Sequence, residues 1–219
     1  MPRKKYMIPQ RRRKVTRRFR RKKKLALRAH RFVERVEDRI PLNSSTLQAD
    51  GTLLVNYKRT FQMSDIPQWA SYKALFDDYI LSKVVLTMRF NHMIATYTSA
   101  TPIVNEIKPL LLIKTDHNDA STGVSWDDLK ESEKARLVQM VGGKPVTHVL
   151  KPAVQVEAYK TAIASAYCAK FNTSIRTVDD SVPHYGLKIQ VKTAPGPAVY
   201  DFGSINLEYK YYFTMKNAE

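Results

Sequence analysis

The sequence predicts an all-β protein with short helices: an antiparallel two-sheet sandwich of the jelly-roll type, preceded by a basic N-terminal arm. Three observations support this prediction. Most of the chain after residue 51 consists of segments rich in β-branched and aromatic residues, and several of them alternate apolar with polar residues. The connections between them are long, for instance 95–107 and 171–183, and the chain has only seven Gly, which argues against a series of tight hairpins. The positive charge is concentrated at the N-terminus.

The basic arm is the most informative segment. The chain carries 37 Lys and Arg against 20 Asp and Glu, and residues 3–31 hold sixteen of the basic residues and no acidic one. The remainder has 37 − 16 = 21 basic against 20 acidic residues, so its net charge is +1. Like charges with few apolar neighbours repel one another, so we expect the free arm to be disordered.

A nucleic acid is the partner that such an arm fits best, because each phosphate that Lys or Arg neutralises releases condensed counterions. This binding positions the strand but reads no base sequence. We predict that the arm binds single-stranded nucleic acid through Arg3, Lys4, Lys5, Arg11, Arg12, Arg13, Lys14, Arg17, Arg18, Arg20, Arg21, Lys22, Lys23, Lys24, Arg28 and Arg31.

Three other roles share part of the arm's composition. A nuclear import signal has the same composition and is compatible with nucleic-acid binding. A membrane-surface anchor needs bulky apolar residues, and residues 11–24 offer only Val15 and Phe19. A mitochondrial presequence is rich in serine, whereas the first serine here is Ser44. We expect no membrane insertion, because the longest compact apolar run covers only residues 110–113.

Behind the arm, apolar residues from Leu25 to Ile40 recur at helical spacing, and Pro41 ends the pattern. This spacing predicts a short amphipathic helix over about 25–39. The predicted organisation is therefore a basic arm with this helix at 1–40, a linker at 41–51 and a jelly-roll domain at 52–219.

The segments with the composition of strands are 52–63, 79–94, 109–115, 146–151, 184–193 and 205–215. The last is the clearest, because Leu207, Tyr209 and Tyr211 alternate with polar residues. One short helical pattern begins at Pro67. A second extends over 126–140, with Ser125 as its predicted N-cap.

The same alternation assigns residues to faces. In 184–193, Leu187, Ile189 and Val191 are expected to point inward and Lys188, Gln190 and Lys192 outward. In 79–94, Ser82, Val84, Leu86, Met88 and Phe90 are expected on one face, with Leu81, Lys83, Val85 and Thr87 on the other.

The sequence offers no convincing catalytic or cofactor site. The five histidines lack metal-ligand spacing, and neither a phosphate-binding loop nor a nucleophile elbow occurs. Cys168, the only cysteine, excludes an internal disulfide and lies in an apolar stretch, where we expect it to be buried. The sequence therefore predicts a protein that is not an enzyme and has no cofactor.

A few residues keep a second interpretation. His117 lies between acidic residues in a polar loop and could bind a cation, although a solvated turn explains it as well. The Asp77–Asp78 pair could hold Ca²⁺ at a subunit contact. Among the aromatic residues, Tyr6, Phe19 and Tyr212 are candidates for stacking on bases.

Three segments have a recognisable pattern: Phe76–Leu86, with its aromatic, tyrosine and Lys-Val positions, the Val149–Pro152 segment ending in Lys-Pro, and the closing strand Gly203–Phe213. Together they resemble segments of the capsid proteins of circovirus-like, small circular single-stranded DNA viruses. The resemblance implies a jelly-roll subunit of an icosahedral shell, with the arm inside the virion on the genome and import into the host nucleus before assembly. It also implies contacts between copies, with Trp69 and Trp126 as candidate aromatic anchors.

The alternative is a ribosomal or other RNA-packaging protein with a basic tail. A ribosomal protein contacts RNA over much of its surface, so a body with a net charge of +1 argues against it. A transcription factor should present a basic recognition helix, which the sequence lacks. DNA is favoured over RNA, but the sequence leaves the genome type open.

Overall fold

The computed structural model describes residues 29–42, 48–91, 108–117, 125–160, 165–193 and 203–217. The strands are β1 (His30–Pro41), β2 (Leu54–Phe61), β3 (Asp78–Asn91), β4 (Leu110–Lys114), β5 (Ala135–Gln139), β6 (Val146–Leu150), β7 (Ala153–Lys160), β8 (Ser165–Phe171), β9 (Ile175–Arg176), β10 (His184–Lys192) and β11 (Ser204–Lys216). The helices are the 3₁₀-helix η2 (Met63–Asp65), α1 (Trp69–Lys73) and α2 (Trp126–Lys130).

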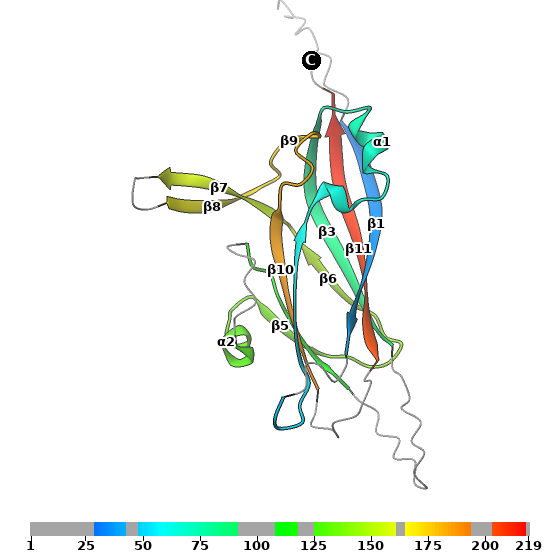
Figure 1. Cartoon of the computed structure of the whole chain (residues 1–219), viewed down its shortest axis with the longest axis vertical. Helices are drawn as coiled ribbons and strands as arrows, with labels where there is room; N and C mark the ends of the chain where they lie inside the picture. The colour runs from blue at the N-terminus through cyan, green and yellow to red at the C-terminus, as the bar shows by residue number, and fades with distance from the viewer. Residues whose placement is uncertain are drawn as a thin grey trace, which may run out of the picture.

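Two antiparallel sheets form the described body (Figure 1). The first has the order β1-β11-β3-β6, with β9 paired to β3, and the second has the order β5-β4-β10-β7-β8, with β2 paired to β10. Apart from β4–β5 and β7–β8, which pair within the second sheet, strands that follow one another in sequence fall in different sheets, and the last two long strands, β10 and β11, lie inside the two layers. This wrapping defines a jelly roll and confirms the predicted fold class.

The core lies between the two sheets, and β11 supplies its centre. Leu207, Tyr209, Tyr211 and Phe213 are each at most 1% exposed, as the alternation predicted. Burial of each such side chain contributes roughly 1.5–3 kcal/mol to folding. The aromatic rings meet edge to face across the layers, with the centroid of Phe61 in β2 at 5.7 Å from Tyr209 and 5.8 Å from Tyr211.

A bulge in the first sheet changes which residues of β3 are buried. The register between β11 and β3 shifts between Tyr212 and Phe213, so that Ser82 has no opposite residue. The hydroxyl of Ser82 donates to the carbonyl of Tyr212 at 2.7 Å. As a result Leu81 is buried together with Val84, which corrects the expectation that Leu81 shares a face with Lys83.

The amphipathic helix predicted at 25–39 is wrong over the described residues. The segment forms β1, which pairs with β11 along its whole length. Its inner face carries two carboxylates, which masked the two-residue alternation of a strand. Glu34 accepts a hydrogen bond from the hydroxyl of Tyr72, and Asp38 accepts one from Tyr57 at 2.6 Å. The segment after the arm is therefore an edge strand of the sandwich.

The helix predicted at 126–140 is correct only in its first third. Ser125 caps α2 as expected, since its hydroxyl accepts the amide of Asp128 at 3.1 Å. The helix ends at Lys130, and residues 135–139 form β5 along β4. The pairing satisfies backbone groups of β4 that a continued helix would leave without strand partners.

The region after Pro152 was not predicted as strands, yet it forms the hairpin β7–β8. Cys168 lies on this hairpin and is exposed, so the expectation of a buried cysteine is wrong. Two residues of β10 also differ from expectation, because Lys188 is 6% and Gln190 4% exposed. The ammonium of Lys188 is neutralised by Asp116 at 3.0 Å, which allows a cation at this buried position.

Candidate nucleic-acid interface and the polar cluster between the sheets

The predicted binding arm is almost entirely outside the described residues. Of its sixteen basic residues only Arg31 is described, and the other fifteen, from Arg3 to Arg28, are not. Arg31 is exposed near the start of β1, opposite Thr214 of β11. The arm therefore joins the sandwich at the edge of the first sheet.

The exposed side of this sheet continues the basic character of the arm. On β1, Arg31, Arg35 and Arg39 are all exposed. Glu208 of β11, at the centre of this side, forms ion pairs with Arg35 at 3.7 Å and with Lys210 at 3.3 Å. This surface was not identified from the sequence. The spacing of four residues between the three arginines was a signal for it, because that spacing places them on one face of a helix or of a strand.

A shallow hollow of about 550 Å³ lies on the same side and has both signs of charge at its walls. It is lined by Glu37, Asp38, Arg39, Thr87, Arg89, Asn206, Leu207 and Glu208. Farther along β11, the ammonium of Lys83 lies 4.2 Å from the ring centroid of Tyr212. That contact uses one face of the ring, which the sequence left open for stacking on bases.

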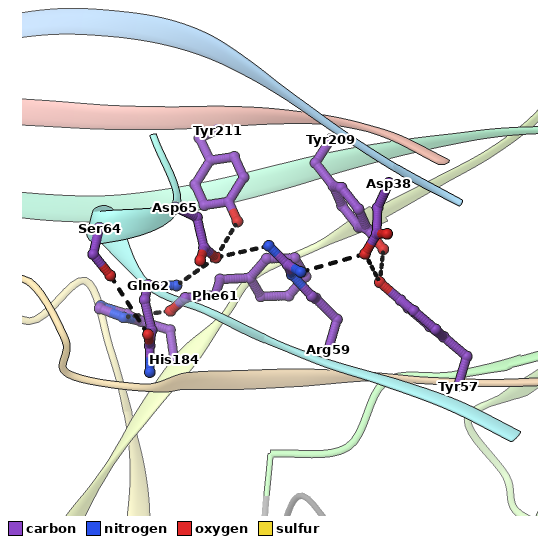
Figure 2. Close-up of polar contacts among 10 residues, drawn as sticks. All are labelled: Asp38, Tyr57, Arg59, Phe61, Gln62, Ser64, Asp65, His184, Tyr209 and Tyr211. Atoms are coloured by element: carbon purple, nitrogen blue, oxygen red, sulfur yellow. Dashed lines mark hydrogen bonds and ion pairs between the residues drawn. The ribbon is translucent and has the colours of Figure 1, made fainter. Parts of the chain in front are cut away.

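Between the sheets lies a polar cluster that joins four elements of the chain (Figure 2). Arg59 of β2 is at its centre, with guanidinium nitrogens 3.3 Å from Asp38 of β1 and 2.9 Å from Asp65 of η2. The hydroxyl of Tyr211 donates to the Asp65 carboxylate at 3.1 Å, and the Asp65 carboxylate also accepts the amide of Gln62 at 3.3 Å. The cluster therefore ties β1, β2, η2 and β11 together.

Phenol groups complete the cluster on the Asp38 side. Tyr57 donates its proton to Asp38 at 2.6 Å, so the hydroxyl of Tyr209, 2.9 Å from that of Tyr57, is the donor to Tyr57. The guanidinium of Arg59 lies 5.6 Å from the ring centroid of Tyr209, which adds a cation–π contact.

Burial and charge set the protonation states in the cluster. Burial, with the hydrogen bond to Asp38, raises the pKa of Tyr57 to about 12. Burial also raises the pKa of Tyr209 and of Tyr211 well above the usual value for a phenol. For Arg59, burial opposes the charge, but the carboxylate of Asp65 outweighs it and holds the pKa of the guanidinium above its usual value. At neutral pH the phenols are therefore donors and the arginine a cation.

This arrangement is structural in character. It contains no nucleophile next to a general base, and its phenols are too weakly acidic to exchange protons near neutral pH. In the described ranges no group of three or more His, Cys, Asp or Glu could hold a metal ion, and this includes the surroundings of Asp77–Asp78. His117, the other residue considered for a cation, has its Nε2 at 2.8 Å from the carbonyl of Lys151. Within the same ranges no helix has the length and hydropathy needed to cross a bilayer.

The two tryptophans proposed as interface anchors differ in the structure. Trp69 is 4% exposed, and its indole N–H donates to Asp180 at 3.1 Å. It is a core residue, so its proposed role as an anchor is wrong. Trp126 is half-buried at the start of α2, with the ammonium of Lys192 at 5.8 Å from its ring centroid.

Comparisons with known proteins agree with the jelly-roll fold. Residues 3–219 match the family model described as circovirus capsid protein. The structure resembles BFDV capsid protein crystallised as a 60-mer, with a TM-score of 0.60 and 15% identity, covering 87% of this chain and 95% of that one. It also resembles BFDV capsid protein crystallised as a decamer, with a TM-score of 0.55 and 13% identity, covering 86% of this chain and 100% of that one. No curated protein sequence matches the chain. At these identities the structural likeness shows a shared jelly-roll fold.

Proposed function

The chain belongs to the circovirus capsid protein family and is therefore a structural protein of a virion; from this premise we propose that copies of it assemble into a small icosahedral shell around a single-stranded genome, which the basic arm neutralises. The observation that carries the proposal is the separation of charge, with sixteen cations in residues 3–31 and a net charge of +1 on the rest. DNA is the favoured genome.

This separation suits a shell. Nearly neutral bodies can pack against one another without the repulsion that a uniform charge of +17 would cause. The arm, joined to β1 at the edge of the sheet, can extend away from the sandwich to the genome. In this proposal Arg31 and Arg35, which are exposed on β1, extend the contact with phosphates from the arm onto the body.

Assembly is tested by electron microscopy of the purified full-length chain. We expect closed particles of uniform diameter. A chain that stays monomeric over a wide range of concentration and salt would contradict the proposal.

Nucleic-acid binding is tested by titrating the full-length chain with single-stranded DNA and RNA of equal length at several salt concentrations. If all sixteen cations engage, log K should fall with log salt with a slope of up to about 11, from roughly 0.7 per phosphate contact. A slope near zero would refute binding by charge neutralisation. Comparison of the two polymers tests the preference for DNA.

The same arm also serves, in this proposal, as a nuclear import signal on the free subunit. Residues 1–24 fused to a fluorescent protein should accumulate in the nucleus. The control carries glutamine at each Lys and Arg of that segment and should stay in the cytoplasm. Equal distribution of both fusions would refute the import role.

A further inference from the structure

The hairpin β7–β8 extends away from the sandwich, as Figure 1 shows. It is attached at its base, where Ala153 is fully buried and pairs with Tyr185 of β10 and with Phe171 of β8. There the ring of Phe171 meets His117 edge to face at 5.0 Å, and the side-chain amide of Gln155 donates to the His117 carbonyl at 3.2 Å. The base is thus fixed to the body.

Beyond the base the hairpin exposes apolar and weakly polar side chains. Tyr167 is 61% and Val156 is 37% exposed, and Phe171 at the base remains 45% exposed. Cys168, opposite Val156, is also exposed. Three of the eight large hydrophobic side chains that the described residues expose therefore lie on this one hairpin, which makes it the most apolar protrusion of the described surface.

A two-stranded ribbon in this position is incomplete. Such a ribbon is marginally stable at best in water unless a further strand or another layer covers it. β8 is the last strand of its sheet, so its outer backbone groups form a free edge in the described part of the chain. A free edge combined with exposed apolar side chains is a surface that readily adds another protein.

From this we propose that the β7–β8 hairpin is a docking element which the body of a neighbouring copy of this chain covers in the shell. The proposal rests on the proposed function, because it requires many copies to assemble. Contacts in which a protrusion of one copy meets a different surface of the next are head-to-tail contacts, and these close into rings when the rotation allows.

The charge of the hairpin favours a protein occupant over a polyanion. Its described residues include only three charged side chains, and Glu157 pairs with Lys160 at 3.8 Å. That leaves Lys170 as the remaining charge, a net charge of +1, which is little attraction for phosphate compared with the arm. The nearly neutral body of another copy matches such a surface, and a copy is present at every position of a closed shell.

Cys168 gives a direct test, because it is the only cysteine and lies on the hairpin. Full-length particles and unassembled subunits are separated by size exclusion and treated with a maleimide dye. We expect labelling of Cys168 to be slower in particles by at least about tenfold, since thiol reactivity follows access. Equal rates in particles and subunits would overturn the proposal while leaving assembly intact, whereas the absence of particles would overturn the proposed function itself.

A second test compares variants of the hairpin with a control variant. V156S together with Y167S should raise the protein concentration needed for particles by roughly tenfold or more. The matched control is L137S, which removes a side chain of similar exposure, 48%, from β5 and should shift that concentration far less. Circular dichroism of unassembled subunits checks that each variant is folded.

If L137S raised the protein concentration needed for particles as much as V156S together with Y167S does, the assignment to the hairpin would be refuted. Protection of Cys168 by neutral lipid vesicles added to free subunits, with no protection on assembly, would likewise refute a second copy as the occupant.

Discussion

Replacing Arg59 with leucine tests whether the polar cluster holds the two sheets together. The guanidinium bridges Asp38 at 3.3 Å and Asp65 at 2.9 Å, and the three side chains are 24%, 33% and 24% exposed. Loss of one partner of a fully buried ion pair costs about 3–5 kcal/mol, because the other charge stays buried without compensation. Here partial exposure lets water reach the carboxylates, so we expect a loss of about 2–4 kcal/mol in the free energy of unfolding.

The assay is urea unfolding of unassembled subunits, followed by tryptophan fluorescence. In thermal unfolding the same loss corresponds to a decrease in Tm of roughly 4–16 °C for a domain of this size. Arg59→Lys keeps one point charge but cannot bridge both carboxylates, and should lose an intermediate amount.

The matched control is Arg35→Leu. This variant removes an ion pair to Glu208 at 3.7 Å from an arginine whose side chain is 69% exposed. Exposed pairs contribute roughly 0–1 kcal/mol, so the loss should be small. If Arg59→Leu were no more destabilising than Arg35→Leu, the cluster would not be a stabilising link between the sheets, and the reasoning would be refuted.

Two further predictions concern the core. Leu207→Asp places a carboxylate at a position that is 1% exposed and should abolish soluble expression, whereas Asn206→Asp on the opposite face of β11 should express normally; equal solubility would mean that the faces of β11 are wrongly assigned. Burial lowers the pKa of His184, so the unfolded chain takes up a proton as the pH falls below about 6.5 while the folded chain does not. Stability should therefore decrease from pH 7.5 to 5 in urea titrations, His184→Asn should flatten that decrease, and an unchanged slope would contradict the assignment.

The parts of the fold that the sequence predicts are those where one local pattern agrees with the tertiary contacts. In β11, every inward residue is apolar or a tyrosine whose hydroxyl meets a partner, so a two-residue alternation survives in the sequence. The α2 N-cap is predicted for a similar reason, because Ser125 and Asp128 interact within one turn.

The errors arise where distant residues change the meaning of a local pattern. In β1, Glu34 and Asp38 can point inward only because side chains from other elements donate hydrogen bonds to their carboxylates. Tyr72 donates to Glu34, and Tyr57 and Arg59 donate to Asp38. Without those partners the remaining apolar positions match a helix better than a strand. In the same way, Lys188 is buried on β10 only because Asp116 lies beside it.

The hairpin β7–β8 was missed for a different reason. Apart from Ala153 at its base, its described apolar residues are at least partly exposed, so they give neither a clean alternation nor a buried run. Cys168 was expected to be buried because an apolar stretch is usually internal in a single chain. In a chain that assembles with copies of itself, such a stretch can instead serve the contact between subunits, which is the role that we propose for it.

The proposed nucleic-acid interface also has one part that the sequence predicts and one part that it does not. Composition alone identifies the arm, because its basic residues are close together in the sequence and can be recognised without the tertiary structure. The exposed basic side of the first sheet requires the pairing of β1 with β11, which brings Arg35 to Glu208 and Lys210. Sequence reasoning found the arm but placed its junction with the body on a helix.

The central claim is that genome binding belongs to the arm and shell formation to the body. The most direct measurement is the nucleic-acid content of purified particles, from the ratio of absorbance at 260 and 280 nm. It compares the full-length chain with a variant in which every Lys and Arg of residues 3–24 is glutamine. We predict that the variant forms particles of the same diameter in electron micrographs but without nucleic acid. Variant particles as rich in nucleic acid as those of the native chain would contradict the claim.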